Sequence, residues 1–193
     1  MLLSLKYKMK KSKEQHVHKI FVLKTDTLYG ICARAFDKES VEKIYNIKGR
    51  DNNKPFIILI HELYDLKRFG IQLTSVQEAF LKKHWPNPLS VVLSCNYKKY
   101  EYLHRGTKTL AFRLPNNDTL RNFIKQNGPI VAPSANPQGE KPAQTILQAK
   151  KYFADFVDEY IDEGKADGKS STVISLQSDG TYQILRKGRY DLI

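Results

Sequence analysis

The sequence contains little cysteine and no long apolar run. Its two cysteines, Cys32 and Cys95, lie far apart in the chain, and neither belongs to a CxxC pair. This arrangement argues against a disulfide framework and a zinc site, and it suits a reducing compartment. No stretch approaches the roughly 18 apolar residues of a membrane-spanning helix, and the first residues are too polar for a signal peptide. We therefore expect a soluble cytoplasmic protein that has no membrane partner.

Several familiar motifs are also absent. The chain has no GxxxxGK[ST] loop, no GxGxxG after a strand, no GxSxG, no HExxH and no EF-hand loop. These absences disfavour P-loop NTPases, dinucleotide-binding folds, serine hydrolases, zinc proteases and calcium sites. Any anion that the protein binds must therefore be held by basic side chains and by the amides of loops.

Acidic residues are scarce relative to basic ones. Lysine and arginine number 32, aspartate and glutamate number 20, and the formal net charge is +12. This excess favours a polyanionic partner such as nucleic acid, a nucleotide or a phosphorylated substrate, although a solvated surface explains it equally well. The length of 193 residues and the 41% hydrophobic content predict one domain with its own core. We expect a basic arm at 1–16 and a folded domain at 17–193.

Apolar runs alternate with helix-capping signals along the chain. The patterns predict strands at 17–23, 56–60, 89–93, 109–114, 130–132, 156–161, 172–176 and 182–185. They predict helices at 41–48, after a cap at Ser40, at 75–83, opened by a capping box at 75–78, and at 118–125 and 145–153. The turn at 178–180 indicates an antiparallel pair near the C-terminus. We therefore expect an α/β fold, a single domain with a twisted mixed β-sheet and flanking helices.

Hydroxyl, amide and basic side chains gather where the predicted elements end. Three clusters stand out, at 24–30, 48–55 and 130–139, and they hold Thr25, Thr27, Lys48, Arg50, Lys54, Ser134 and Asn136. Arginine offers a planar fork to a phosphate or carboxylate, and lysine offers a point charge. Arg113 and Arg186 lie within apolar strands, where an arginine seldom points inward without an anion to meet. Taken alone, the first cluster is explained nearly as well by an ordinary strand-to-turn motif, and the third has an ordinary Asn-Pro turn as its alternative. For the second cluster, a helix end explains Lys48 well but explains Arg50 and Lys54 poorly.

Taken together and in order, these segments resemble the YrdC-type threonylcarbamoyl-AMP synthases. The family pattern comprises a PT[DE]TxYG strand end, a KxR…[NK]P element, a WPGP-like turn, an AxRxP strand, a Pxxx[ST]SAN loop, an ST[IV][IV] strand and a terminal LRxG. The matching segments are Lys24–Gly30, Lys48–Pro55, Trp85–Pro88, Ala111–Pro115, Pro129–Asn136, Ser171–Ile174 and Leu185–Gly188. The resemblance covers residues 17 to 190 and is to the short, single-domain bacterial form.

The resemblance implies a YrdC-like fold with a concave basic cleft and a nucleotidyltransferase activity. These enzymes combine L-threonine, bicarbonate and ATP, with Mg²⁺, into L-threonylcarbamoyladenylate and pyrophosphate. The product passes to a threonylcarbamoyl transferase complex that modifies position 37 of tRNA. Such chemistry requires positioning and charge neutralisation and no activated nucleophile.

Matched position by position, the resemblance also implies site residues. Thr27, Arg113 and Ser171 match positions that hold threonine. The positions at ATP are matched by Lys48, Arg50, Lys54, Thr109, Ser134, Asn136 and Arg186, of which Lys48 and Arg50 are the expected catalytic residues. No side chain is expected to bind a metal directly. Three family prolines are replaced here, by Lys24, Asp51 and Lys187, and Asp51 could compete with the ligand for Arg50.

Two other functions remain open at this point. The net charge is compatible with a non-catalytic module that binds double-stranded RNA or tRNA, although no RNP1-type run or GXXG loop is present. A carbamoyl-adenylate-forming domain of the hydrogenase-maturation type shares the implied fold. Such domains sit in longer chains with cysteine-rich zinc segments and an acylphosphatase domain, and this sequence contains neither.

Overall fold

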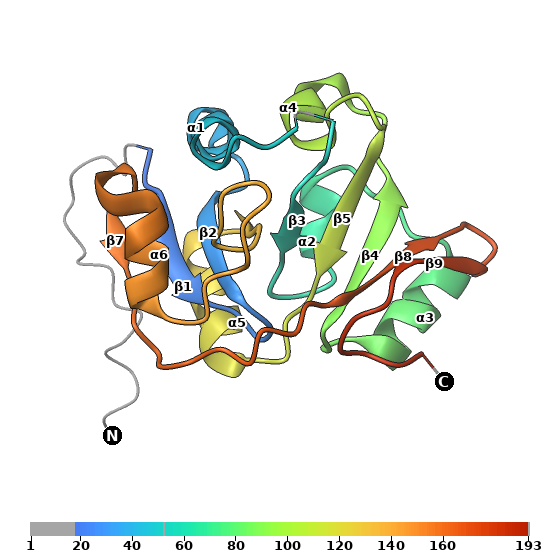
Figure 1. The fold of residues 1–193 in the computed structure, drawn as a ribbon. Coiled ribbons are helices and arrows are strands. Elements are labelled where there is room, and N and C mark those ends of the chain that lie inside the picture. The colour runs from blue at the N-terminus through green and yellow to red at the C-terminus, as the bar shows by residue number, and fades with distance from the viewer. Residues whose placement is uncertain (1–17, 52, 193) are drawn as a thin grey trace.

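The computed structural model describes residues 18–51 and 53–192, so the predicted basic arm at 1–16 lies outside the described residues. The described part folds around a mixed sheet of nine strands in the order β7-β1-β2-β6-β3-β5-β4-β8-β9 (Figure 1). The strands are β1 (Phe21–Lys24), β2 (Tyr29–Arg34), β3 (Ile57–Leu59), β4 (Leu89–Ser94), β5 (Thr109–Arg113), β6 (Ile130–Val131), β7 (Glu159–Tyr160), β8 (Thr172–Leu176) and β9 (Tyr182–Arg186). Parallel pairs join β1 to β7, β3 to β5 and β4 to β8, and the other neighbours are antiparallel. The predicted fold class is confirmed.

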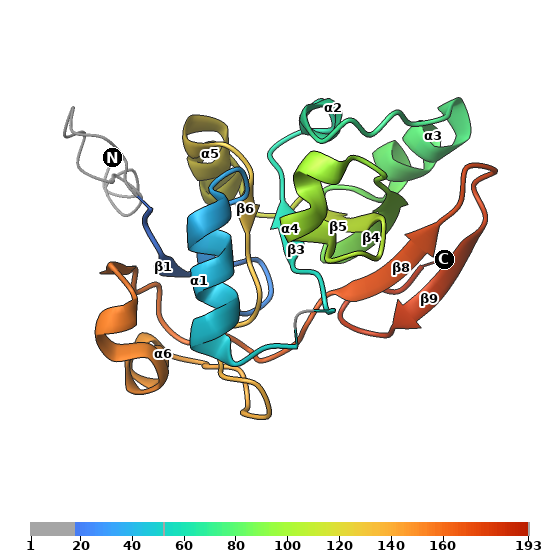
Figure 2. The ribbon, with the colours of Figure 1, turned by 90° about the horizontal axis from the view of Figure 1, so that it is seen from above.

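Helices cover the sheet on both sides. They are α1 (Lys38–Lys48), α2 (Asp65–Arg68), α3 (Ser75–His84), α4 (Glu101–His104), α5 (Asp118–Asn127) and α6 (Ile146–Phe153), with the short 3₁₀ helices η1 (Lys98–Tyr100) and η2 (Ala154–Phe156). Side chains of α1, α2, α3 and α6 are buried in the main core on one face of the sheet, and those of α5 are buried on the other face with Phe21 and Cys32. In Figure 2, α1 and α6 lie near β1, and α3 lies at the far end near β4. None of the helices in the described residues is long and apolar enough to cross a membrane.

Strand β5 shows how the sequence positions the site. Successive side chains of a strand point to opposite faces of a sheet. Leu110 and Phe112 are almost completely buried in the main core. Thr109, Ala111 and Arg113 alternate with them and line a cleft on the other face. One short apolar strand therefore supplies both core packing and three side chains of the candidate site.

The structure corrects four details of the predicted elements. Strand β2, which forms the centre of the first half of the sheet, was not predicted, because its sequence YGICAR is rich in small residues with little strand preference. The capping box lies one residue earlier than predicted: Thr74 caps α3 and exchanges hydrogen bonds with Gln77. The expected strand at 156–161 contains only the two residues of β7, after the 3₁₀ turn η2. The first predicted helix is capped by Asp37 rather than Ser40, since the Asp37 carboxylate accepts from the Ser40 amide.

Candidate active site

A cleft of about 350 Å³ lies where the ends of β2, β5, β8 and β9 meet the loops after α1 and β6. Seven of the predicted site residues line it, although they come from six separate segments of the chain. They are Thr27, Arg50, Thr109, Arg113, Ser134, Ser171 and Arg186. Three other predicted residues, Lys48, Lys54 and Asn136, do not line the cleft, and their contacts give them different roles.

Three arginines converge on this cleft. Arg50 follows Gly49, which ends α1 in the left-handed conformation at φ 58°, and Arg113 and Arg186 end β5 and β9. Burial lowers the pKa of Arg186, and the nearby charges of Arg113 and Arg50 lower it further. Burial also lowers the pKa of Arg50. Among the described residues that line the cleft there is no carboxylate, so the site gathers positive charge that an anionic ligand would neutralise.

Arg113 is held from one side. Its side chain forms an ion pair with Asp26, with 3.0 Å between Nη2 and Oδ1, and both side chains are 4% exposed. The same Nη2 donates to Thr25 Oγ1 at 3.3 Å. The Arg113 Nε atom is buried and has no hydrogen-bond partner in the described part of the chain. A buried donor without a partner is costly, and Arg113 is one of the residues that line the cleft.

The turn between β1 and β2 carries the first predicted cluster. Thr25 Oγ1 lies 3.1 Å from Thr27 Oγ1 and donates to Leu28 O at 2.8 Å, which fixes the turn. Gly30 then brings β2 close to the loop after β6. A Cβ atom on Gly30 would lie 3.1 Å from Cys32 Sγ and 3.4 Å from a backbone oxygen of that loop. A larger residue there would separate two walls of the cleft.

Lys48 does not present its charge to the cleft. It is 3% exposed, and its Nζ donates to the carbonyl oxygens of Ser134, at 2.6 Å, and Asn136. Ser134 Oγ in turn donates to Asn136 Oδ1 at 2.6 Å. Burial, with a smaller effect of Arg50, lowers the pKa of Lys48 to about 7. Lys48 and Asn136 therefore hold the loop that places the Ser134 hydroxyl in the cleft, and their contact with ATP stays a prediction.

Lys54 acts through its backbone. Its side chain is 61% exposed and lies 3.5 Å from Asp51 Oδ2, whereas its carbonyl oxygen accepts from Arg50 Nε at 3.1 Å. The Asp51 amide donates to the side chain of Gln138, which joins this loop to the one after β6. Asp51 thus pairs with Lys54, and the side chain of Arg50 is held by a carbonyl oxygen instead of by the competing acid.

The opposite wall is built around Ser171. Its Oγ lies 2.9 Å from Ser90 Oγ on β4, and Arg186 Nη2 donates to its carbonyl oxygen at 2.9 Å. Thr109 Oγ1 lies 3.1 Å from Thr107 Oγ1 at the entrance. Sequence reasoning missed Asp26 as the partner of Arg113. The available signal was an acid between two threonines of the first cluster.

Residues 16–188 match the model of the Sua5/YciO/YrdC family, which carries the description "Telomere recombination". The match includes every residue placed in the cleft above.

Individual proteins agree with this match. A threonylcarbamoyl-AMP synthase of Pyrococcus abyssi is 31% identical over 82% of this chain and 47% of its own length. A putative threonylcarbamoyl-AMP synthase of Methanocaldococcus jannaschii is 30% identical over 83% of this chain and 76% of its own. The solved structure of P. abyssi Sua5 complexed with L-threonine matches 89% of this chain and 51% of that one, at 31% identity, with a TM-score of 0.81. This chain therefore spans about half the length of the Pyrococcus relative.

Proposed function

Since the chain belongs to the Sua5/YciO/YrdC family, we propose that it is a threonylcarbamoyl-AMP synthase. It would convert L-threonine, bicarbonate and ATP into L-threonylcarbamoyladenylate, pyrophosphate and water. The observation that carries the proposal is the convergence of Arg50, Arg113 and Arg186 on one cleft whose described lining holds no carboxylate. Relatives named for this activity, and a related structure that contains L-threonine, support the choice of substrates.

The reaction asks for charge neutralisation more than for covalent catalysis. The amine of threonine attacks CO₂ formed from bicarbonate, loses a proton and becomes an N-carboxylate. An oxygen of this carboxylate then attacks the α-phosphorus of ATP, the bond between the α-phosphorus and the bridging oxygen breaks, and pyrophosphate leaves. Two anions that repel each other must be brought together, and fixed cations lower the cost of doing so.

The geometry suggests a division of roles. Arg113, which lines the cleft together with Thr27 and Ser171, would hold the carboxylate of threonine. Arg50 and Arg186 would meet the phosphates, with the Ser134 hydroxyl as a further donor. Lys48 would act by holding the Ser134 loop, since its Nζ is occupied by two carbonyl oxygens.

Mg²⁺ would enter as part of the nucleotide substrate. Carboxylate oxygens are its usual protein ligands, and the described residues that line the cleft include none. No group of three or more potential metal ligands occurs among the described residues. The metal would therefore be held by the phosphates of ATP, where it would neutralise charge that the arginines do not reach.

The product would be consumed by a reaction that transfers the threonylcarbamoyl group to tRNA. We place both steps in the cytoplasm, where ATP and tRNA are available. A mixed anhydride of a carbamate and a phosphate is reactive towards water. Rapid transfer to tRNA by a nearby transferase would therefore limit loss of the product by hydrolysis.

The direct test is release of pyrophosphate by the purified protein with ATP, Mg²⁺, bicarbonate and L-threonine. We expect release that requires all four components, and much less when L-serine or glycine replaces threonine. Omission of each component in turn is the control. Release that is independent of threonine, or no release, would remove the proposed function.

A further inference from the structure

The segment that joins β7 to β8, residues 161–171, crosses the whole sheet. Strand β7 lies at one edge of the sheet and β8 lies next to the other. In Figure 1 the chain between them runs along the lower side of the molecule, past the strands in between. The end of this crossover segment places Ser170 and Ser171 in the cleft. A long connection without secondary structure thus supplies part of the wall that faces Thr27 and Arg113.

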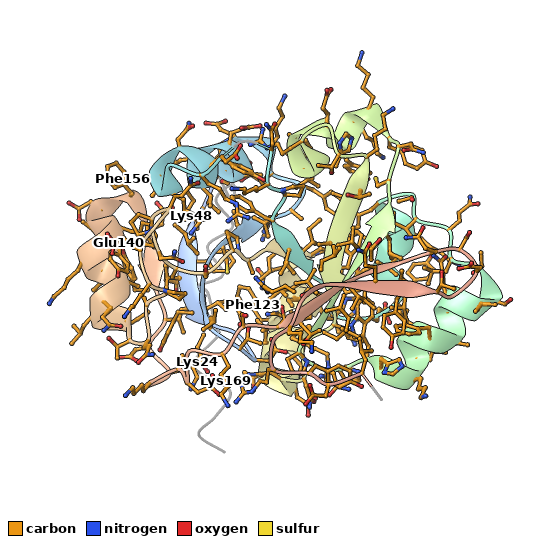
Figure 3. All side chains as sticks on the ribbon, turned by 45° about the vertical axis from the view of Figure 1, so that its right-hand side comes forward. Lys24, Lys48, Phe123, Glu140, Phe156 and Lys169 are labelled. Carbon is orange, nitrogen blue, oxygen red and sulfur yellow. The ribbon has the colours of Figure 1, made fainter. Side chains whose placement is uncertain are left out.

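Lys24 fastens the middle of the crossover segment. The residue immediately precedes the turn that carries Thr27, and its Nζ donates to Glu163 O at 3.3 Å and Lys165 O at 3.0 Å. Next to these bonds, Tyr29 Oη donates to Gly164 O at 2.7 Å. Figure 3 labels Lys24 at the lower end of the molecule, away from Lys48 at helix α1. The ammonium group of Lys24 therefore joins the end of β1 to two carbonyl oxygens of the crossover segment.

Arg189 fastens the far end of the same segment. Its guanidinium forms an ion pair with Asp167 on the crossover segment and donates to Asp26 O on the turn at 3.2 Å. The Arg189 amide also donates to Ser170 O at 2.9 Å. One side chain thus bridges the turn that anchors Arg113 and the segment that presents Ser171.

We propose that Lys24 and Arg189 are positioning residues that fasten the crossover segment to the turn between β1 and β2. Together they hold Ser171 opposite Thr27 and Arg113, on either side of the same ligand. The inference deepens the proposed function and takes from it the identity of that ligand, L-threonine. Neither residue lines the cleft, so each acts through the walls and not on the reacting atoms.

The experiment compares Lys24→Gln, Arg189→Gln and the double variant with two matched controls, Lys19→Gln and Lys187→Gln. The controls remove two exposed lysines, one just before β1 and one just after β9. Amide hydrogen exchange of the crossover segment is measured without ligand, and L-threonine binding is measured by calorimetry without ATP.

Because the Arg189 ion pair is half-exposed, we expect each single variant to weaken threonine affinity about three- to tenfold. In the double variant, exchange of residues 162–170 should rise at least about tenfold, and KM for ATP should change less than about twofold.

Two results would overturn the proposal. One is an amide exchange rate of the crossover segment that is the same in the double variant, the wild type and the controls. The other is faster amide exchange in the double variant with unchanged threonine affinity. That result would show that the contacts of Lys24 and Arg189 hold the crossover segment but do not affect the site. If the wild-type protein binds no threonine and releases no pyrophosphate, the proposed function fails, and the exchange measurement still decides whether Lys24 and Arg189 hold the segment. Arg189→Lys keeps a cation, but a lysine would contact either Asp167 or Asp26 O and not both. Its threonine affinity should therefore lie between those of Arg189→Gln and the wild type.

Discussion

Arg113 and Asp26 form an ion pair between two side chains that are each only 4% exposed. The pair occupies one nitrogen of the guanidinium, which also donates to Thr25, and Nε has no partner among residues 18–51 and 53–192. Asp26 is therefore a counterion that fixes the orientation of Arg113 before any ligand arrives. An arginine held in this way loses little conformational entropy when it binds a carboxylate.

Asp26→Asn should destabilise the protein, because it leaves the buried guanidinium of Arg113 without its counterion. Breaking one partner of a buried ion pair costs about 3 to 5 kcal/mol. Urea unfolding at neutral pH measures the loss. Asp155→Asn removes an exposed carboxylate and should cost less than about 0.5 kcal/mol. Equal losses in the two variants would show that the ion pair contributes nothing to the fold.

Arg50 and Lys54 should differ sharply although both lie in the same basic motif. Arg50 lines the cleft, and Arg50→Ala should lower kcat/KM for pyrophosphate release by about 10²- to 10³-fold. The Lys54 side chain is 61% exposed and paired with Asp51, so Lys54→Ala should lower kcat/KM for pyrophosphate release less than about threefold. Circular dichroism checks that both variants fold. A loss for Lys54→Ala as large as that for Arg50→Ala would place the Lys54 ammonium group at the nucleotide.

The stability of the protein should depend on pH through Lys48. Its pKa is lowered from 10.5 to about 7 in the folded protein by burial and by Arg50. Between these values the unfolded chain binds more protons, so the contribution of Lys48 to the free energy of unfolding rises with pH. Relative to Lys48→Met, the wild type should gain about 1 to 4 kcal/mol between pH 7 and pH 10. A difference between the two proteins that stays constant over this range would contradict the lowered pKa.

Gly188 should tolerate no side chain. A Cβ atom there would lie 2.3 Å from Ser171 C and 2.6 Å from Ser170 O, both backbone atoms. Gly188→Ala should therefore cost about 1 to 3 kcal/mol of stability and displace Ser171 from the cleft. Thermal unfolding and threonine binding measure the two effects, with Lys187→Ala as the control at the neighbouring exposed position. Unchanged threonine binding in Gly188→Ala would show that Ser171 does not contribute to the site.

The sequence predicted much of this site because its signals were local. Arg113 stood out as a charge within an apolar strand, and the structure confirms that it is buried. The two-residue period of β5 then places Thr109 and Arg113 on one face. The contact of Asp26 with Arg113 was not predictable in this way, because it joins residues far apart in sequence across the sheet.

Side-chain direction was also beyond the sequence patterns. Lys48 and Arg50 lie in one motif, yet the end of α1 turns Lys48 towards the loop after β6 and Arg50 towards the cleft. Strand β2 was missed because Gly30, Cys32 and Ala33 give it little strand character. Its pairing with β1 and β6 supplies the stability that its own residues lack.

The measurement that tests the central claim most directly is identification of the product. The purified protein is incubated with ATP, Mg²⁺, L-threonine and ¹³C-labelled bicarbonate, and ¹³C and ³¹P spectra are recorded as pyrophosphate accumulates. We predict a labelled carbamate carbon whose signal is split by the phosphorus of AMP, in an amount equal to the pyrophosphate formed. Pyrophosphate without this coupled carbon, or the coupled carbon in the absence of threonine, would contradict the account.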